Sequence, residues 1–258
     1  MLALAIRGFR QGRTTRQVSP NVVDHALSSH VIAYQTSDMK QLVIAIDGPS
    51  GAGKGTVSST LAKSLGYRHI DTGAMYRAVG WKSQVEKVPL DDENAVAELV
   101  GRVEILVEAG TVSIDGHDVT KVIRTSDIDK AAAAVARLPR VREIMVALQR
   151  TLGEAGGVVM EGRDIGTVVF PTADVKIYLD ASADERARRR VGDAAHTGGR
   201  EGHEAVAASI AARDKSDSTR AVSPLTLAAD AFYIDTTSMP IDQVVKTAMQ
   251  LVSEKINA

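Results

Sequence analysis

The pattern of apolar and polar residues predicts strands that alternate with helices from residue 42 onward. An apolar run at 42–46 leads through a glycine-rich segment into a helical pattern that ends near Leu65. A short strand at 67–70 follows, and a second helix opens within 71–77. This alternation is typical of an α/β protein with a parallel sheet.

The alternation is interrupted once, by a segment that we interpret as an insertion. Residues 103–107 and 111–115 flank a turn that contains a glycine, and so predict a hairpin rather than a crossover. Two alanine-rich stretches at about 126–137 and 139–152 then predict helices. The second of them has Pro139 in its first turn, where proline is favoured.

The last part of the chain returns to alternating strands and helices. Residues 157–161 and 175–180 are apolar enough to be parallel strands that are buried on both faces. A helix rich in arginine comes next, and the glycines of 192–202 predict a mobile flap. Three elements complete the prediction: a helix near 205–217, a strand at 231–235 and an amphipathic helix from Ile241.

The first 40 residues lie outside this pattern. They lack apolar periodicity, and four arginines precede the first acidic residue, Asp24, a composition that resembles an organelle transit peptide. Met39 lies just before the first predicted strand, where an authentic start often lies. We therefore expect residues 1–40 to be a disordered or misassigned extension rather than a targeting segment.

Composition limits the classes of function. The chain has 258 residues, 44% of them apolar, enough for one large domain or for a core with inserted subdomains. A net charge of −1 and an aromatic content of 3% argue against binding a nucleic acid polymer. Because there is no cysteine, disulfides, thiolate zinc sites and cysteine nucleophiles are excluded. No apolar run reaches membrane-spanning length, and we expect a cytoplasmic monomer that binds no membrane.

The glycine-rich segment after the first strand predicts a phosphate-binding loop. Its GxxxxGK spacing lies between a strand and a helix, so backbone N–H groups and the positive end of the helix can face phosphate oxygens. Lys54 adds a mobile charge that can follow a phosphoryl group. The residues expected to bind the phosphates are Gly48, Pro49, Ser50, Gly51, Ala52, Gly53, Lys54, Gly55 and Thr56.

The residue after Lys54 narrows the class of nucleotide-binding protein. In most such proteins Ser or Thr follows the lysine and binds Mg²⁺, whereas here Gly55 precedes Thr56. This GKGT ending resembles nucleoside monophosphate kinases, and the chain has no NKxD-type segment of the kind that reads guanine in switch GTPases. We expect Mg²⁺ to bind only with a nucleoside triphosphate, mainly through its phosphates, and expect no metal site in the protein itself.

Arginines in the second half of the chain are candidates for binding the second anion. Phosphoryl transfer requires two anions to be brought in line and their repulsion to be neutralised. Thr72 is expected to cap the helix that carries Arg77, which leaves N–H groups free for an acceptor phosphate. Arg163 follows a predicted parallel strand, at the end where open α/β sheets bind ligands.

Other charged residues allow a structural interpretation. Arg213, Asp217 and Arg220 are spaced to share one helix face, although a surface salt bridge explains the first two equally well. Glu161 either contacts the water shell of Mg²⁺ or is a structural carboxylate, and the acidic run 91–93 fits a helix N-terminus. The following histidines lack metal-ligand spacing and are interpreted as surface or loop residues: His69, His117, His196 and His203.

From about Met39 to the C-terminus, the sequence resembles bacterial cytidylate kinases. The segments that carry the resemblance are IAIDGPSGAGKGT at 44–56, DTGAMYR at 71–77, PRVRE at 139–143, GRDIGTVVFP at 162–171, ERARRR at 185–190 and RDKSDSTRAVSPL at 213–225. Together and in this order, they are far more specific than the phosphate loop alone.

The resemblance implies a P-loop NTPase fold of the α/β class. It has a five-stranded parallel sheet flanked by helices, a small monophosphate-binding insertion with antiparallel strands, and a mobile lid. We expect one such domain at 41–258, after the extension at 1–40. Its parts are expected at about 41–70, 155–190 and 205–258 for the core, about 71–140 for the monophosphate-binding part and about 191–204 for the lid.

The resemblance also implies an activity: ATP-dependent phosphorylation of CMP and dCMP to CDP and dCDP, which makes the protein a phosphotransferase with a phosphate group as acceptor. The catalytic residues it implies are Lys54, Arg163, Arg186 and Arg190, the last two acting on ATP from the lid. The substrate-binding residues it implies are Arg77 and Arg163 for the acceptor phosphate, Arg142 and Asp164 for the base, Arg213 and Asp217 for the ribose, and Arg220, Thr72 and Tyr76.

Two details and two alternatives remain open from the sequence. Thr72 replaces the family's usual serine and keeps its hydroxyl, whereas Ala133 stands where several members carry a serine that assists base recognition. The alternative functions are a P-loop kinase of another small acceptor, such as shikimate or dephospho-coenzyme A, and a nucleotide-sensing module that binds without turnover.

Overall fold

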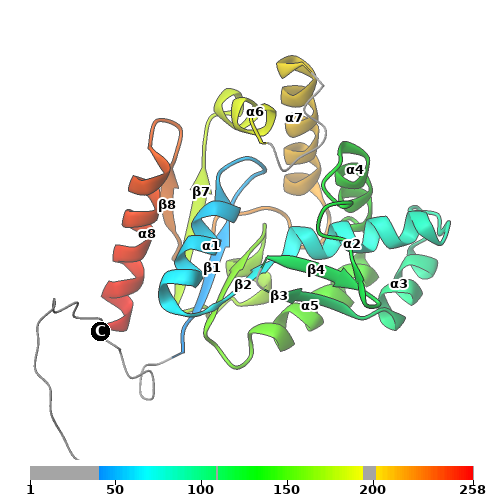
Figure 1. The fold of residues 1–258 in the computed structure, drawn as a ribbon, viewed down its shortest axis with the longest axis horizontal. Coiled ribbons are helices and arrows are strands. Elements are labelled where there is room, and N and C mark those ends of the chain that lie inside the picture. Colours follow the sequence, from blue (N-terminus) through cyan, green and yellow to red (C-terminus); the bar gives the residue numbers. More distant parts are fainter. Residues whose placement is uncertain (1–40, 109, 194–201, 258) are drawn as a thin grey trace, which may run out of the picture. The chain divides into compact units, whose positions relative to one another are not determined.

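Five parallel strands form the central sheet of the protein, in the order β2-β6-β1-β7-β8 (Figure 1). The computed structural model describes residues 41–108, 110–193 and 202–257. Every strand pairs in parallel with its neighbours, so the carboxyl ends of all five lie at one edge. The strands are β1 (Val43–Asp47), β2 (Arg68–Asp71), β6 (Val158–Glu161), β7 (Val175–Asp180) and β8 (Phe232–Asp235). This sheet and its flanking helices confirm the predicted fold class.

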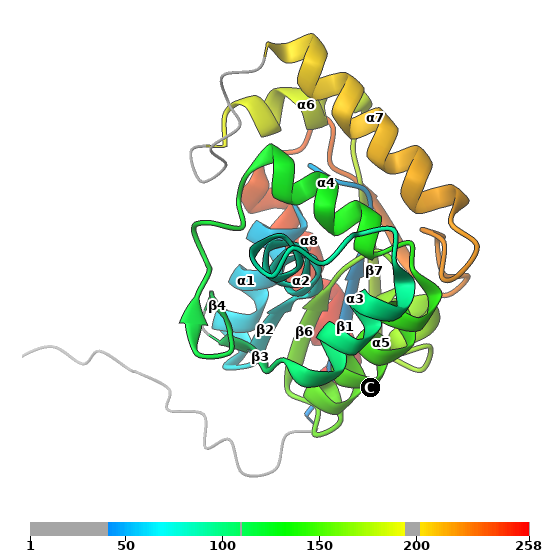
Figure 2. The ribbon, with the colours of Figure 1, turned by 90° about the vertical axis from the view of Figure 1, so that its right-hand side faces the viewer.

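Helices cover both faces of the sheet, as the alternation of side chains along the strands requires. Ile44 and Ile46 of β1 pack into one cluster with α1 (Lys54–Leu65) and α8 (Ile241–Ile256). Ala45, between them, packs into a second cluster on the other face, with residues of α2 to α5. Figure 2 shows α1 and α8 on one side of the sheet and α3 and α5 on the other. Because β1 and β6 are buried on both faces, they form a rigid support for the residues at their ends.

The insertion is a small antiparallel sheet of β3 (Ile105–Glu108), β4 (Thr111–Ile114) and β5 (His117–Asp118). The predicted hairpin of β3 and β4 is confirmed, and β5 is an additional strand that sequence reasoning missed. Asp115 and Gly116 join β4 to β5, both with positive φ. Asp-Gly between short apolar segments is a strong hairpin signal, so the sequence did contain the information.

The remaining helices are α2 (Thr72–Val85), α3 (Glu93–Arg102), α4 (Ser126–Val135), α5 (Pro139–Gly153), α6 (Ala183–Val191) and α7 (His203–Thr219). Of these, α4, α5 and α7 match the predicted ranges to within a few residues, whereas only the position, and no end, was predicted for α2, α3 and α6. Asp92 caps α3 by accepting a hydrogen bond from the backbone N–H of Ala95, which confirms that the acidic run 91–93 begins a helix. The flap predicted at 192–202 and the lid at 191–204 fall largely on residues 194–201, which lie outside the described residues. Within the ranges described, no helix is long and apolar enough to cross a membrane.

Small residues allow α2 and α4 to pack closely. A Cβ atom built on Gly80 of α2 would lie 3.0 Å from the Cβ of Ala131 and 3.1 Å from the backbone nitrogen of Ala132 in α4. Ala131 and Ala132 are themselves buried. The alanine run of α4 is therefore explained, at these two positions, by the short distance between the two helices.

We expect that Gly80→Ala lowers the free energy of unfolding by about 1–3 kcal/mol, because the added methyl group overpacks this contact. Gly101→Ala is the matched control, since Gly101 also lies in a helix, α3, but a Cβ there meets nothing within 4 Å. The control substitution is expected to raise stability, by at most about 1 kcal/mol, through helix propensity. Urea unfolding of both variants measures the difference, and equal effects would show that the α2–α4 contact tolerates the methyl group.

Candidate active site

The phosphate loop connects the carboxyl end of β1 to α1 at the centre of the sheet edge. Gly53, just before α1, is left-handed with φ 92° and offers no side-chain cap, so the N–H groups of the first helical turn remain free to bind an anion. Gly48 approaches β7 so closely that a Cβ would lie 1.9 Å from the carbonyl oxygen of Leu179. Glycine is required at both positions.

Lys54 lies at the start of α1 with its side chain inside the loop. Its Nζ donates a hydrogen bond to the carbonyl oxygen of Pro49 at 2.8 Å. Burial, together with the positive charge of Arg163, lowers the pKa of Lys54 to about 7, although Glu161 opposes the shift. Phosphate oxygens next to Lys54 would favour its charged form and so oppose the effect of burial.

Asp47, the last residue of β1, connects the phosphate loop to the segment after β6. Its carboxylate accepts hydrogen bonds from the backbone N–H groups of Ile165, at 2.9 Å, and Gly166, at 2.7 Å. Burial raises the pKa of Asp47 to about 6, partly offset by these two bonds. Both residues belong to η1 (Ile165–Val169), a single π-helical turn of a kind often found at functional sites. Sequence reasoning missed Asp47, although an acidic residue at the end of a buried strand could have indicated it.

The two residues expected to read the base form a buried ion pair. A guanidinium nitrogen of Arg142, in α5, donates to Asp164 Oδ2 at 2.5 Å, and Arg142 is 2% exposed. The guanidinium carbon lies 5.6 Å from the centre of the Tyr76 ring, which is a cation–π distance. Arg220 binds the other carboxylate oxygen of Asp164 at 3.3 Å. Burial raises the pKa of the Tyr76 hydroxyl to about 12, so the ring remains neutral.

Asp217 is shared by three arginines. Arg163 Nε donates to Asp217 Oδ2 at 2.9 Å, Arg213 Nε lies 4.0 Å from the same oxygen, and Arg220 Nη1 lies 3.8 Å from Oδ1. Burial alone would raise the pKa of Asp217, but the three positive charges lower it. The Arg213 and Asp217 side chains are only 17% and 7% exposed, so the alternative of a surface salt bridge is wrong. Arg220 follows the end of α7 rather than lying on the helix.

The start of α2 differs from the expectation in one respect. Asp71, at the end of β2, caps the helix by accepting a hydrogen bond from the N–H of Ala74 at 2.9 Å, and it also binds Arg77 at 2.9 Å. Thr72 is the first helical residue, and its hydroxyl donates to the carbonyl oxygen of Glu161 at 2.7 Å. The predicted cap at Thr72 is therefore wrong, because a cap residue has extended backbone angles and Thr72 is already helical.

Glu161 and His69 face each other across β6 and β2. His69 Nε2 lies 2.8 Å from Glu161 Oε1, and the pKa of His69 is raised because this hydrogen bond and charge outweigh its burial. The interpretation of His69 as a surface or loop residue is wrong, since its side chain is 17% exposed and lines the cavity. A Cβ on Gly55 would lie 3.6 Å from Glu161 Oε1, so this carboxylate is next to the phosphate loop.

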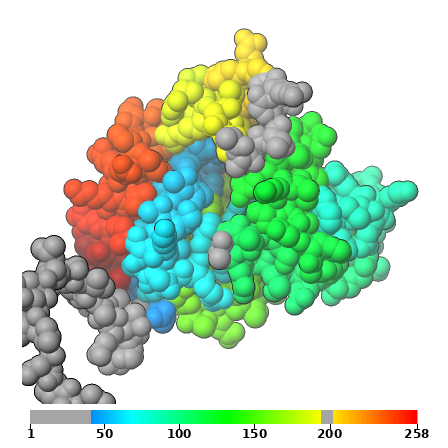
Figure 3. Space-filling view, in the orientation of Figure 1, coloured from blue at the N-terminus to red at the C-terminus, as the bar shows by residue number. Residues whose placement is uncertain are grey.

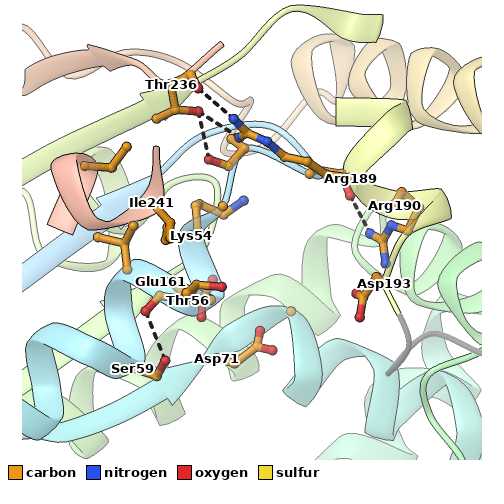
Figure 4. Close-up of a pocket in the computed structure, with 18 of the residues that line it drawn as sticks. Lys54, Thr56, Ser59, Asp71, Glu161, Arg189, Arg190, Asp193, Thr236 and Ile241 are labelled. Atoms are coloured by element: carbon orange, nitrogen blue, oxygen red, sulfur yellow. Dashed lines mark hydrogen bonds between the residues drawn. The ribbon is translucent and has the colours of Figure 1, made fainter. Parts of the chain in front are cut away.

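Two arginines of α6 contact the phosphate loop at Ser50. Arg186 donates to the backbone oxygen of Ser50 at 3.1 Å and pairs with Asp214 at 2.6 Å, and it does not line the cavity. Arg190 donates to the Ser50 hydroxyl at 2.8 Å and does line the cavity. In Figure 4, Lys54, Glu161 and Arg190 face the same space from α1, β6 and α6. Arg186 thus supports the loop from outside, whereas Arg190 is positioned to reach a ligand.

Part of this network lines one cavity of about 910 Å³, whereas Arg142, Asp164 and Asp217, which were expected to bind the base and the ribose, do not line it. The phosphate loop lines one part of it, and Arg77, Arg163 and Arg213 line another. Figure 3 shows this face of the molecule, with α6 in yellow above the blue and cyan residues of the phosphate loop and α1. Among the described residues, no group of three or more His, Asp or Glu side chains could bind a metal ion. The cavity is large enough for two nucleotides or parts of them.

A phosphate loop at the centre of a parallel sheet, opposite a second group of arginines, defines a P-loop phosphotransferase. The sequence model of the family "Cytidylate kinase" matches residues 44–254. The chain therefore belongs to the cytidylate kinase family.

Individual relatives agree with this family. The chain is 48% identical to a cytidylate kinase of Geobacillus sp. (strain WCH70) over 217 residues, which cover 83% of this chain and 97% of the relative. It is 47% identical to a cytidylate kinase of Bacillus subtilis (strain 168) over 220 residues, which cover 84% and 98%. A solved shikimate kinase of Acinetobacter baumannii is 15% identical with a TM-score of 0.44, covering 84% of this chain and 95% of that one, a similarity too distant to bear on function.

We expect ATP binding at pH 8 to take up protons, because the pKa of Lys54 is about 7 in the free site and phosphate oxygens favour its charged form. Calorimetry in two buffers with different ionisation enthalpies measures the uptake, of up to about one proton. Lys54→Arg is the control, since a guanidinium is always protonated and should bind without uptake. Heats that do not depend on the buffer for the unsubstituted protein would show that Lys54 is already charged.

Proposed function

We propose that this protein transfers the γ-phosphoryl group of ATP to CMP or dCMP, giving ADP and CDP or dCDP. The observation that carries the proposal is that one cavity is lined both by a phosphate loop and by Arg77, Arg163 and Arg213. Two anion-binding groups that share a cavity are what transfer between two nucleotides requires. The cytidylate kinase family supplies the identity of the acceptor.

The donor half of the site is the phosphate loop. The loop N–H groups and the N-terminus of α1 bind the ATP phosphates, and Lys54 moves with the transferring group. Lys54 donates a hydrogen bond to the loop carbonyl of Pro49, and a phosphate oxygen can replace that carbonyl as the acceptor. Arg190, bonded to Ser50 on the same loop, binds the developing charge from the α6 side.

The acceptor half is formed by Arg77 and Arg163, which bind the acceptor phosphate, and by Arg213 and Asp217, which bind the ribose. Asp217 supports this assignment because its carboxylate is charged and buried beside Arg163 and Arg213, so that it can accept hydrogen bonds from ribose hydroxyls. Since the acceptor is already a phosphate oxyanion, no general base is required. The arginines neutralise repulsion between the two nucleotides and hold them in line.

Base recognition is assigned to Arg142 and Asp164. Cytosine presents acceptors at N3 and O2 beside a donor at N4, and a neighbouring guanidinium and carboxylate match that pattern. Uracil has an acceptor, O4, in place of the N4 donor, so Asp164 would face a second acceptor. Arg142 and Asp164 are both buried and in contact, which supports the proposal that the two side chains are already positioned to bind the cytosine edge. Several family members carry a serine that assists base recognition, and this chain has Ala133 at that position. That this serine contact to the base is missing here stays a prediction.

Mg²⁺ enters with ATP and is bound mainly through the phosphates. Glu161 fits a contact with its water shell, because the carboxylate is buried beside Gly55 and lines the cavity. The residues from 71 to 140 and the lid at 191–204 are assigned to acceptor binding and closure. The proposal includes that the protein is a monomer and that it is located in the cytoplasm.

Two alternative functions are weaker. A kinase of shikimate or dephospho-coenzyme A would use the same loop, but it would have no use for the buried pair of Arg142 and Asp164. A nucleotide-sensing module would bind ATP without turnover, and the arginines that line the cavity with Lys54 would then lack a function.

We expect ADP release to be fastest with CMP and dCMP, and much slower with UMP, AMP or GMP. The physical reason is the complementarity of Arg142 and Asp164 to the cytosine edge, which is worth about 1–3 kcal/mol for one mismatched polar contact. A coupled ADP-release assay with each monophosphate measures the order. Activity led by AMP, or the absence of activity with every monophosphate, would contradict the proposed function.

Asp164→Asn is expected to reduce the CMP-to-UMP preference by about tenfold, because the amide can donate to uracil O4, while ATP affinity stays nearly unchanged. The ratio of kcat/KM values for CMP and UMP measures this effect. Asp127→Asn, which removes an exposed carboxylate from α4, is the control and should leave the ratio unaltered. Because Asp164 balances two buried arginines, a thermal melt must accompany the assay. An unchanged preference in a folded Asp164→Asn variant would show that the base reader is misassigned.

A further inference from the structure

Asp129, in the first turn of α4, lies where arginines from three other elements converge. Its carboxylate is 3.3 Å from Arg213 of α7, 3.9 Å from Arg77 of α2 and 3.9 Å from Arg190 of α6, measured to a guanidinium Nη1 in each case. The side chain is 19% exposed and lines the cavity. No role was expected for this residue from the sequence, and the proposed mechanism does not use it.

Two of the three arginines, Arg77 and Arg213, are incompletely paired by other groups. Arg213 lies closer to Asp129, at 3.3 Å, than to Asp217, at 4.0 Å. Within the described residues, the buried Nε atoms of Arg77 and Arg213 have no hydrogen-bond partner. Buried guanidinium donors without acceptors are costly, so these two arginines are suited to a further anion.

Asp129 also offsets repulsion within the arginine group. Burial and the charge of Arg163 lower the pKa of Arg213, and Asp129 acts against this shift. For Arg190 too, burial lowers the pKa, and Asp129 is the strongest opposing charge. A carboxylate at this point therefore makes the cluster of cations stable when no nucleotide is bound.

We propose that Asp129 is a competing carboxylate: without a monophosphate, it pairs with Arg77, one of the two arginines assigned to the acceptor phosphate, and with the neighbouring Arg190 and Arg213, and the phosphate must replace it. The inference rests on the proposed function for the identity of the nucleotide. A phosphate dianion carries more charge and more acceptor oxygens than one carboxylate, so it can displace Asp129. Because the ion pairs with Asp129 must be broken first, every anion that enters gains less binding free energy.

This exchange sets the affinity for the monophosphate and favours nucleotides over free anions. CMP keeps its base contacts at Arg142 and Asp164, which do not involve Asp129, and so tolerates the reduced gain in binding free energy at its phosphate. Inorganic phosphate has no other contacts and loses most of its affinity. Asp129 is thus a specificity-determining residue that acts through Arg77, Arg190 and Arg213 rather than on the reacting atoms.

The test is calorimetric binding of CMP, inorganic phosphate and cytidine to Asp129→Asn and to the unsubstituted full chain. We expect the variant to bind CMP and inorganic phosphate about tenfold more tightly, equivalent to about 1.4 kcal/mol. Cytidine is uncharged and meets only Arg213 of the three arginines, through its ribose, so its affinity should rise by a much smaller factor. Asp127→Asn is a closely matched control, because it removes a carboxylate from the same first turn of α4, but one that is 85% exposed and pairs with Lys130. It should leave all three affinities unchanged.

The inference is overturned if Asp129→Asn binds phosphate and CMP no more tightly than the unsubstituted protein, or if cytidine gains affinity by the same factor. A second measurement needs no variant: in a crystal structure with CMP bound, Arg213 Nη1 and Asp129 Oδ1 should be further apart than 4 Å, and a retained ion pair would overturn the exchange. Failure of the proposed function is distinguished by the ADP-release assay, because inorganic phosphate binding tests the exchange even in a protein that does not phosphorylate CMP.

Discussion

The repulsion among cationic side chains around one cavity is the constraint that the rest of this structure satisfies. Lys54, Arg77, Arg163, Arg190 and Arg213 all line the cavity, and in water-poor surroundings such charges destabilise one another unless carboxylates lie close by. The acidic residues supply that compensation from several elements, at the ends of β2 and β6 and on α4 and α7. When the two polyanions are absent, the residues that would bind them therefore form a network of internal ion pairs.

The sheet determines where that network can form. Because all five strands are parallel, their carboxyl ends meet at one edge, and Asp47, Asp71 and Glu161 are the last residues of three of them. Asp47 binds the backbone of η1 and so fixes the segment that carries Arg163 and Asp164 next to the phosphate loop. The two halves of the site are thereby connected by hydrogen bonds to main-chain groups, which are less adaptable than contacts between long side chains.

The elements of the fold were predictable from the sequence, whereas several contacts in the site were not. Periodicity and the GxxxxGK spacing are local signals, and they predicted the phosphate loop, the parallel strands and the hairpin of β3 and β4. The partner of His69 was not predictable in this way, because Glu161 lies 92 positions away and meets it only through the pairing of β2 with β6. The prediction of the α2 cap was wrong for a local reason. Asp71 and Thr72 are both good cap residues, and only the backbone angles decide between them.

The position of Asp129 illustrates why the remaining contacts could not be predicted. Arg77 and Gly80 lie one turn apart on α2, while Asp129 and Ala131 lie within the first two turns of α4. The close contact of Gly80 with Ala131 sets the spacing of the two helices, and so sets the distance between Arg77 and Asp129. From the sequence, the alanine run suggested only a missing serine at Ala133. In the fold, its neighbours Ala131 and Ala132 have a packing function that brings a carboxylate to the arginines, a relation between two helices that no single segment of sequence contains.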